Sequence, residues 1–234
     1  MKGLIAEGRA PRIIALENVC GTLTSHEGKD FVAICSTFEK AGYVFGAVVI
    51  DASHFVPHSR PRLFMIGVRA DTKLPAGLIQ TNASALWHTR GLRTALERAP
   101  AEVRDNWVWW SLPKPAQRNT TFAALIEENP TSVEWHTPTE THLLLAMMSD
   151  VNKAKLEAAK SAKRRTVGAI YKRTRFDEAA RKVQRAEIRL DDVAGCVRTP
   201  AGGSSRQTIM VIEGNKVRSR LLSPRVAARL MGLA

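Results

Sequence analysis

A glutamate and two arginines are the residues of this sequence whose types and positions are best suited to chemistry. Glu17 directly follows the apolar run 13–16, which predicts a fully buried strand because the run is continuous rather than alternating. Ligands of open α/β sheets bind beyond the carboxyl ends of the strands, so we expect Glu17 at the edge of an active site. The alternative is an ordinary polar residue that closes a strand.

The two arginines, Arg60 and Arg62, stand where a proline-bracketed loop leads into an apolar strand. The loop at 54–59 separates predicted strands at 45–50 and 62–68, and so short a connection predicts an antiparallel pair. Strand side chains alternate, so both guanidiniums are expected on one side, as a fork for a phosphate or a carbonyl edge. The alternative is a pair of solvated charges at a sheet edge.

The chain as a whole is strongly basic. It has 234 residues and a formal net charge of +13, and its 44% hydrophobic content is typical of a folded protein. This charge predicts an anionic partner, of which nucleic acid is the commonest. Residues 153–189 hold thirteen Lys or Arg against four Asp or Glu. In this stretch Arg173 and Arg175 alternate with other residues and lie near aromatic residues in the sequence, which indicates a surface that binds successive phosphates of a nucleic acid. The alternative is a solvated helical face.

A loop rich in short polar side chains lies between residues 195 and 207. Paired glycines let the backbone approach a ligand closely, and Ser, Arg and Gln side chains can read base edges or hold phosphates. We therefore expect DNA contacts from Arg198, Thr199, Gly202, Gly203, Ser204, Ser205, Arg206 and Gln207. A strand at 208–213, a return strand and a helix capped by Ser223 are predicted to follow.

Cysteine usage and hydropathy exclude several classes of protein. The three scattered cysteines predict neither a disulfide framework nor a metal site, and they fit a reducing compartment. Cys35 lies on an apolar helical stripe and is expected in the core, as are the tryptophans at 107–110. The sequence has no signal-peptide pattern and no membrane-spanning apolar run, so we expect a soluble, cytoplasmic protein that does not bind a membrane.

Three stretches resemble, in order, motifs of the cytosine-C5 DNA methyltransferase family. Residues 17–19, Glu-Asn-Val, are similar to the ENV motif of that family. Residues 57–62, Pro-His-Ser-Arg-Pro-Arg, resemble its PQxRxR motif, and residues 220–232 resemble its RxLTPRE…ARLMG helix. His58, Ser223 and Val226 depart from the family's usual Gln, Thr and Glu. The departure at Val226 removes a carboxylate from that helix.

The resemblance implies an α/β fold, namely the C-terminal part of a Rossmann-like methyltransferase sheet followed by a smaller mixed, basic target-recognition domain. We expect a partial catalytic α/β domain at residues 1–80. A linker and the target-recognition domain are expected at 81–215, and a helix that returns to the catalytic domain at 216–234.

The resemblance also implies an activity, the methylation of cytosine C5 in double-stranded DNA, as in restriction–modification. S-adenosylmethionine would be the methyl donor, and the target base would be flipped out of the duplex. Glu17 would act as an acid near N3 of the base, and Arg62 would stabilise the O2 side. Arg60 would lie nearby, and Asn18 would hold the loop or contact the base.

Two motifs that the resemblance implies are absent from the sequence. No Phe-x-Gly-x-Gly turn precedes a helix, and no cysteine follows a proline, so the cofactor-binding turn and the nucleophile are missing. We therefore expect a fragment that is inactive alone. The alternative is a DNA-binding remnant, or the recognition subunit of a split methyltransferase whose second chain carries the missing N-terminal half.

Overall fold

The computed structural model describes residues 2–177, 179–197 and 207–233, and the chain forms two compact units. The first unit comprises Met1–Asp51 and Pro61–Pro115, and the second comprises Ala52–Arg60 and Ala116–Ala234. These boundaries differ from the expected division, because the first unit continues to Pro115 and residues 216–234 fold with the second. The functional assignment of the three expected domains stays a prediction.

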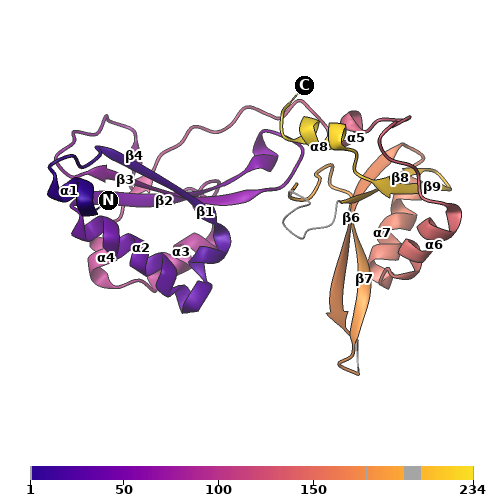
Figure 1. Ribbon diagram of the computed structural model, residues 1–234, viewed down its shortest axis with the longest axis horizontal. Coiled ribbons are helices and arrows are strands. Elements are labelled where there is room, and N and C mark those ends of the chain that lie inside the picture. The colour runs from indigo at the N-terminus through magenta and orange to yellow at the C-terminus, as the bar shows by residue number, and fades with distance from the viewer. Residues whose placement is uncertain (1, 178, 198–206, 234) are drawn as a thin grey trace. The chain divides into compact units, whose positions relative to one another are not determined.

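A three-stranded sheet with the order β1-β3-β2 forms the centre of the first unit (Figure 1). Its strands are β1 (Ile13–Val19), β2 (Tyr43–Asp51) and β3 (Pro61–Arg69), and β3 runs antiparallel to both neighbours. The antiparallel pairing predicted across the loop after β2 is therefore confirmed. Because β1 and β2 run in the same direction, they end at one edge of the sheet, where β3 begins.

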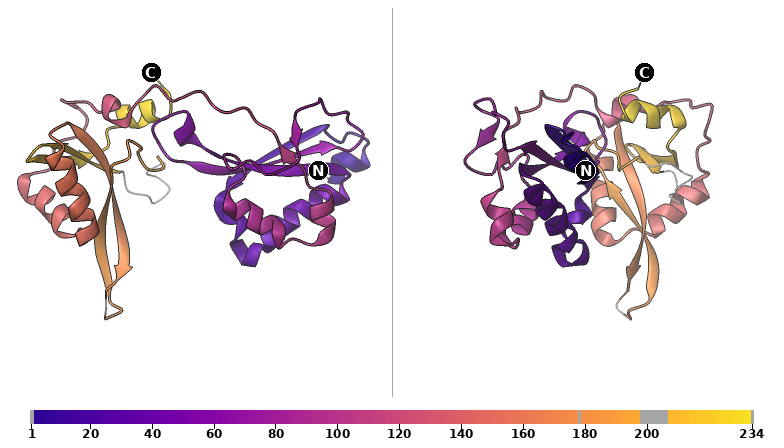
Figure 2. Two further views of the ribbon diagram at one scale, coloured as in Figure 1. Left: turned by 180° about the vertical axis from the view of Figure 1, so that it is seen from behind. Right: turned by 60° about the vertical axis from the view of Figure 1, so that its left-hand side comes forward.

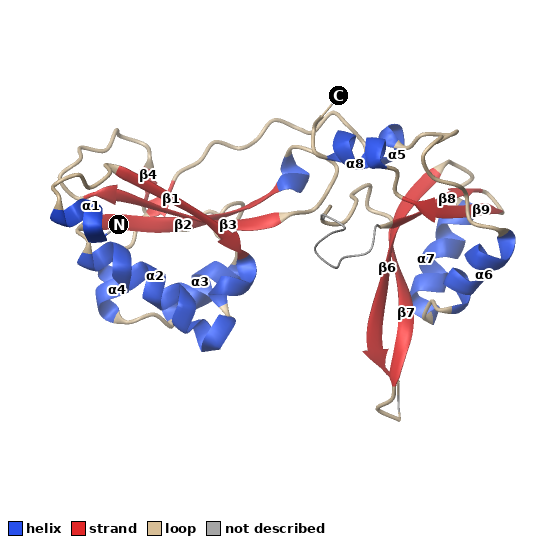
Figure 3. Cartoon of the chain, in the orientation of Figure 1, coloured by secondary structure: helices blue, strands red, loops and turns tan. Residues whose placement is uncertain are grey.

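The helices of the first unit gather on one face of this sheet (Figure 3). Phe31, Cys35 and Phe38 are buried on α2, so the predicted helix and the core position of Cys35 are confirmed. Burial raises the pKa of the Cys35 thiol to about 12. The helical segments are α1 (Lys2–Ala6), η1 (Cys20–Leu23), η2 (Ser25–Gly28), α2 (Lys29–Lys40), α3 (Arg90–Glu97) and α4 (Ala101–Asp105).

Tryptophans complete the packing of the first unit. Trp87 and Trp110 pack against Val48 and Val68 on the second face of the sheet, while Trp107 packs against the helical face. The prediction that the tryptophans fill the core is therefore confirmed. Two short strands, β4 (Ile79–Gln80) and β5 (Trp109–Trp110), form a separate antiparallel pair.

The prediction that β1 is fully buried is wrong. Ile13, Leu16 and Val19 are 62%, 43% and 53% exposed, whereas β2 is buried along most of its length. The cause is position, because β1 lies at the edge of the described sheet and pairs only with β3. A continuous apolar run indicates a strand suited to burial on both faces, but it does not reveal which neighbours cover it.

The second unit is built on an antiparallel sheet with the order β7-β6-β8-β9 (Figure 2). Its strands are β6 (Thr166–Phe176), β7 (Lys182–Arg189), β8 (Thr208–Glu213) and β9 (Lys216–Leu221). Alternate residues of β8 enter two cores. Ile209 packs with α5 (Phe122–Leu125) and α8 (Pro224–Leu230), while Met210 packs with α7 (Asp150–Ser161). The helix α6 (Pro138–Ala146) precedes α7, and η3 (Ala52–His54) lies in the loop after β2.

Several predicted elements of the second unit are confirmed. The strand at 208–213 turns at Gly214 into β9, and Ser223 caps α8 by accepting a hydrogen bond from Val226 N at 3.2 Å. The fold is thus mixed α/β with several sheets, and it is compatible with a methyltransferase domain. Within the described ranges, no helix is long and apolar enough to cross a membrane.

Candidate functional site

The sheet edge where β1 ends and β3 begins brings Glu17 and Arg62 together. Arg62 Nε lies 2.7 Å from Glu17 Oε1, and the Arg62 side chain is 19% exposed while that of Glu17 is 51% exposed. Glu17 pairs with Phe64 in the strand register, so Arg62 is its diagonal neighbour on the same face of the sheet. Arg62 also donates from Nη1 to the Pro61 carbonyl at 2.9 Å. The guanidinium therefore holds the carboxylate in a defined position that solvent can reach.

Asn18 does not join this pair. Consecutive strand residues point to opposite faces, so Asn18 lies on the face opposite Glu17. Its Oδ1 accepts a hydrogen bond from Val19 N at 2.8 Å. The two expected roles of Asn18, to hold the loop or to contact the base, stay predictions.

Two residues near Arg62 add to the electrostatics of this edge. Cys20 begins the turn after β1, and burial raises the pKa of its thiol; the positive charge of Arg62 opposes this shift and Asp51 reinforces it. A thiol with a raised pKa is a poor nucleophile. Sequence reasoning missed Asp51, although its position as the last residue of an apolar strand was a usable signal.

Arg60 has different partners from Arg62. The motif-like stretch 57–62 crosses the boundary between the compact units, with Arg60 in the second unit and Arg62 in the first. Arg60 Nη1 lies 3.3 Å from Cys196 Sγ and 3.5 Å from the Val197 carbonyl. Arg60 therefore precedes β3, which starts at Pro61, and the expected common fork of the two guanidiniums stays a prediction.

The loop that carries Arg60 is anchored inside the second unit by backbone and side-chain bonds. Ala194 N donates to the Pro57 carbonyl at 2.9 Å, and Ser59 N donates to the Ala194 carbonyl at 2.9 Å. His58 is buried, and its Nδ1 lies 2.6 Å from the Leu230 carbonyl at the end of α8. The residue that departs from the family's usual Gln thus ties this loop to the C-terminal helix.

Of the residues expected to contact DNA in the loop 195–207, Gln207 alone lies in the described part of the chain. Its Oε1 accepts from Gly195 N at 3.1 Å, and its Nε2 donates to the Cys196 carbonyl at 3.0 Å. Both polar ends of Gln207 therefore hold the two ends of this loop together. The following expected contacts lie outside the described residues: Arg198, Thr199, Gly202, Gly203, Ser204, Ser205 and Arg206.

Arg173 and Arg175 lie on β6 and share one carboxylate of the neighbouring strand. Arg175 donates to Glu187 Oε1 from Nε at 2.7 Å and also from Nη2. Arg173 Nε lies 3.3 Å from Glu187 Oε2, and its guanidinium carbon is 5.5 Å from the centre of the Tyr171 ring. These arginines therefore stand on a strand, not on the helical face that was the alternative.

A buried arginine that sequence reasoning did not single out lies in the third motif-like stretch. Arg220 on β9 is fully buried and donates from Nη1 to the Leu221 carbonyl and from Nη2 to the Glu127 carbonyl, each at 3.0 Å. Its guanidinium carbon lies 5.0 Å from the centre of the Trp135 ring. Burial lowers the pKa of Arg220. The described residues contain no group of three or more His, Cys, Asp or Glu side chains able to hold a metal ion.

Residues 4–234 match the family described as C-5 cytosine-specific DNA methylase. Among individual proteins, an orphan methyltransferase, M.SPBetaI of Bacillus phage SPbeta, is 35% identical over 69 residues, which are 29% of this chain and 16% of that protein. A DNA-cytosine methyltransferase of Escherichia coli K12 is 32% identical over 81 residues, which are 31% of this chain and 17% of that protein.

A third relative, the type II methyltransferase M.NgoFVII of Neisseria gonorrhoeae, is 38% identical over 65 residues, which are 27% of this chain and 17% of that protein. The aligned part of the chain thus spans about a sixth of the length of these relatives. The family match, in contrast, extends over almost the whole sequence. This chain therefore belongs to the C-5 cytosine-specific DNA methylase family.

Proposed function

We propose that this chain supplies the base-facing acid and the DNA-binding part of a DNA (cytosine-5-)-methyltransferase. The observation that carries the proposal is the 2.7 Å ion pair between Glu17 and Arg62, at the sheet edge where the resemblance expects an acid and an arginine. Family membership supports cytosine C5 in DNA as the methylated atom. We also propose that the protein is soluble and cytoplasmic. Its substrate would be double-stranded DNA, as in restriction–modification.

The chemistry explains why such a pair is useful. C5 of cytosine is a weak nucleophile, and in the proposed reaction a thiolate adds to C6 so that electron density rises at C5 and negative charge develops at N3 and O2. Arg62 Nε lies against Oε1 of Glu17, so Oε2 would hold or transfer a proton at N3. Arg62 would position Glu17 through Nε and would stabilise O2 with its remaining N–H groups.

These 234 residues contain neither the motif expected to bind the methyl donor nor the motif expected to provide the nucleophile. The family generally uses S-adenosylmethionine, but this sequence has neither the glycine-rich turn nor a cysteine after a proline. Burial raises the pKa of the thiols of Cys20 and Cys35, which makes both poor nucleophiles, and Cys196 follows Gly195 rather than a proline. We therefore propose that the chain alone is inactive, and that residues outside it bind the donor and provide the thiolate. These residues would precede it in the same polypeptide or lie on a second chain.

Methyl transfer from labelled S-adenosylmethionine to duplex DNA tests this proposal directly. The 234-residue chain alone is expected to transfer no methyl group. The DNA upstream of the Met1 codon should be read for a glycine-rich turn and a Pro-Cys pair, and that segment should then be expressed together with the chain. We expect methylation from the combined protein, and methylation by the chain alone would contradict the division of roles.

Three single substitutions in the combined protein test the residue assignments. Glu17→Gln removes the acid and should lower the rate by about 100-fold or more, and Arg62→Ala should have an effect of similar size. Glu97→Gln is the matched control, since it makes the same change at an exposed position of α3 outside the site. Equal losses in all three variants would indicate a general structural defect and would contradict the assignment.

The second candidate function is a DNA-binding remnant or the recognition subunit of a split methyltransferase. The concentration of positive charge in residues 153–189 favours it, because that charge does not depend on the catalytic edge. It would apply if the upstream DNA encodes no catalytic segment and the chain still binds duplex DNA. If the chain neither binds duplex DNA nor supports methylation, both candidates fail.

A further inference from the structure

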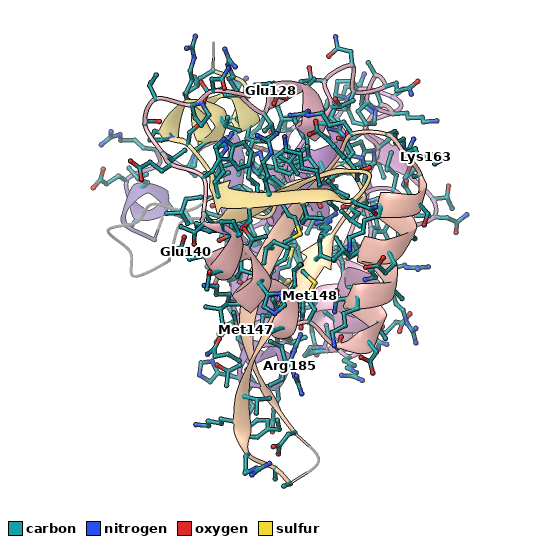
Figure 4. The ribbon with its side chains drawn as sticks, turned by 90° about the vertical axis from the view of Figure 1, so that its right-hand side faces the viewer. Glu128, Glu140, Met147, Met148, Lys163 and Arg185 are labelled. Carbon is teal, nitrogen blue, oxygen red and sulfur yellow. The ribbon has the colours of Figure 1, made fainter. Side chains whose placement is uncertain are left out.

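The β6–β7 hairpin extends beyond the rest of the second unit (Figures 1 and 2). Residues Gly168–Ile170 at its base are buried, whereas every residue from Lys172 to Phe176 is exposed. Figure 4 places Arg185 where the hairpin leaves the body of the unit, beyond Met147 and Met148. An outer hairpin with both faces exposed adds little apolar burial, so its sequence is free to serve binding rather than packing.

Arginines collect on one face of this outer hairpin. Arg173 pairs directly with Arg185 in the antiparallel register, and Arg175 pairs with Val183. Directly opposed residues share a face, and like charges in that position are destabilising. On the described part of this face, Glu187 is the carboxylate that both Arg173 and Arg175 contact. Asp177, directly after β6, interacts electrostatically with Arg185 but also pairs with Arg181. Among the described residues, two carboxylates thus serve four guanidiniums, and the excess of positive charge would be neutralised by an anionic partner.

The same face is continuous with the start of the loop 195–207. Tyr171 lies on this face next to Arg173 and packs so closely on Gly195 that a Cβ there would be 2.4 Å from Tyr171 Oη. Gln207 holds the Gly195 amide from the other end of the loop. The loop that sequence reasoning assigned to DNA recognition therefore begins beside the arginine face.

We propose that the arginine face of the β6–β7 hairpin, formed by Arg173, Arg175 and Arg185, enters the major groove of duplex DNA and contacts guanine. Two antiparallel strands about 4.8 Å apart fit a groove roughly 12 Å wide, and five exposed residues extend about 17 Å, more than the groove depth of roughly 8.5 Å. The guanidinium is the side-chain group that most often contacts O6 and N7 of guanine. This inference rests on the proposed function, since it assigns a DNA-contacting element to that protein.

Glu187 acts in this arrangement as an internal counter-ion. It aligns Arg173 and Arg175 through its two carboxylate oxygens, and it reduces their attraction for phosphates of any sequence. DNA that binds to this face has to displace Glu187 or share the arginines with it. Removing the carboxylate therefore strengthens binding to DNA of random sequence, whereas removing arginines weakens it.

Fluorescence anisotropy with the full 234-residue chain and a random-sequence DNA duplex tests the inference. Arg173→Ala combined with Arg185→Ala should weaken binding about tenfold or more. The matched control, Lys29→Ala combined with Lys40→Ala, removes two exposed charges from α2, outside the basic stretch 153–189, and should change binding less than about threefold. Glu187→Gln should tighten binding and steepen its dependence on salt.

A second duplex tests the groove. Replacing guanine with 7-deazaguanine removes the N7 acceptor from the major groove but leaves the phosphates unchanged, so it should weaken binding of the wild-type chain but not of the Arg173/Arg185 variant. Circular dichroism should confirm that each variant is folded. No effect of 7-deazaguanine, or equal losses in the arginine variant and the lysine control, would overturn the hairpin assignment while leaving the proposed function intact. Failure of the wild-type chain to bind any duplex would instead contradict the DNA-binding role itself.

Discussion

Arg220 provides the most quantitative test of how the second unit is held together. Its guanidinium is fully buried, bonded to the Leu221 and Glu127 carbonyls at 3.0 Å each, and close to the Trp135 ring. Through these contacts it links β9 to the segment that follows α5. Within the part of the chain that the structure describes, Arg220 Nε is buried without a hydrogen-bond partner, so part of the desolvation cost of the charge is not recovered.

Two substitutions at Arg220 separate the contributions of volume and charge. Arg220→Ala removes two charge-assisted hydrogen bonds, leaves two carbonyls without these donors and creates a cavity, and it should lower the free energy of unfolding by about 3 kcal/mol. Arg220→Met loses the same bonds but keeps most of the volume and removes the cost of a buried charge. The expected loss for this variant is about 1 kcal/mol.

Hydrogen exchange measured peptide by peptide as urea is added is the appropriate assay. Peptides from β8 and β9 should lose protection in the order wild type, Arg220→Met, Arg220→Ala, and peptides from the first unit serve as the internal control. The reasoning would be refuted by an alanine variant within about 1 kcal/mol of wild type, or by a methionine variant as unstable as the alanine variant.

Three further predictions concern pH, association and packing. His88 is fully buried, and burial lowers its pKa, so its stabilising contribution is present above the unfolded pKa of about 6.5 and is lost as the pH falls below it. The urea midpoint of the first unit should therefore drop between pH 7.5 and 5.5, less so in His88→Gln, and exposed His142→Gln is the control. The exposed edge strand should cause self-association in sedimentation velocity that Leu16→Lys reduces, and a monomeric wild-type chain would contradict this. Gly195→Ala should lower the thermal midpoint because its Cβ would clash with Tyr171, and Tyr171→Ala should relieve that clash in the double variant; simple additivity of the two effects would refute the contact.

Residues close together in the sequence determine much of the secondary structure. The helix that buries Cys35, the strand at 208–213 with its return strand, and the cap at Ser223 are all predictable because each depends on residues close in sequence. The motif-like stretches at Glu17 and Arg62 likewise identified the family that the comparison over residues 4–234 shows. These features depend on side chains within about one helical turn or one strand, so they can be predicted from the sequence alone.

The tertiary structure decided which residues meet. Glu17 and Arg62 are far apart in the sequence, and only the pairing of β1 with β3 makes them diagonal neighbours. The loop before β3 folds with the second unit, and there Arg60 has Cys196 as a neighbour. The contacts between Arg60 and Cys196 depend on chain segments distant in sequence, for which the local pattern carries no information.

The opening apolar run illustrates the same division. Its composition determined that residues 13–16 form a strand, because continuous branched and aliphatic residues favour extended backbone that is buried on both faces. Whether those faces are buried was decided by the sheet, in which β1 has one described neighbour and remains exposed. Propensity acts within a segment, whereas burial and charge pairing depend on which segments come together in space.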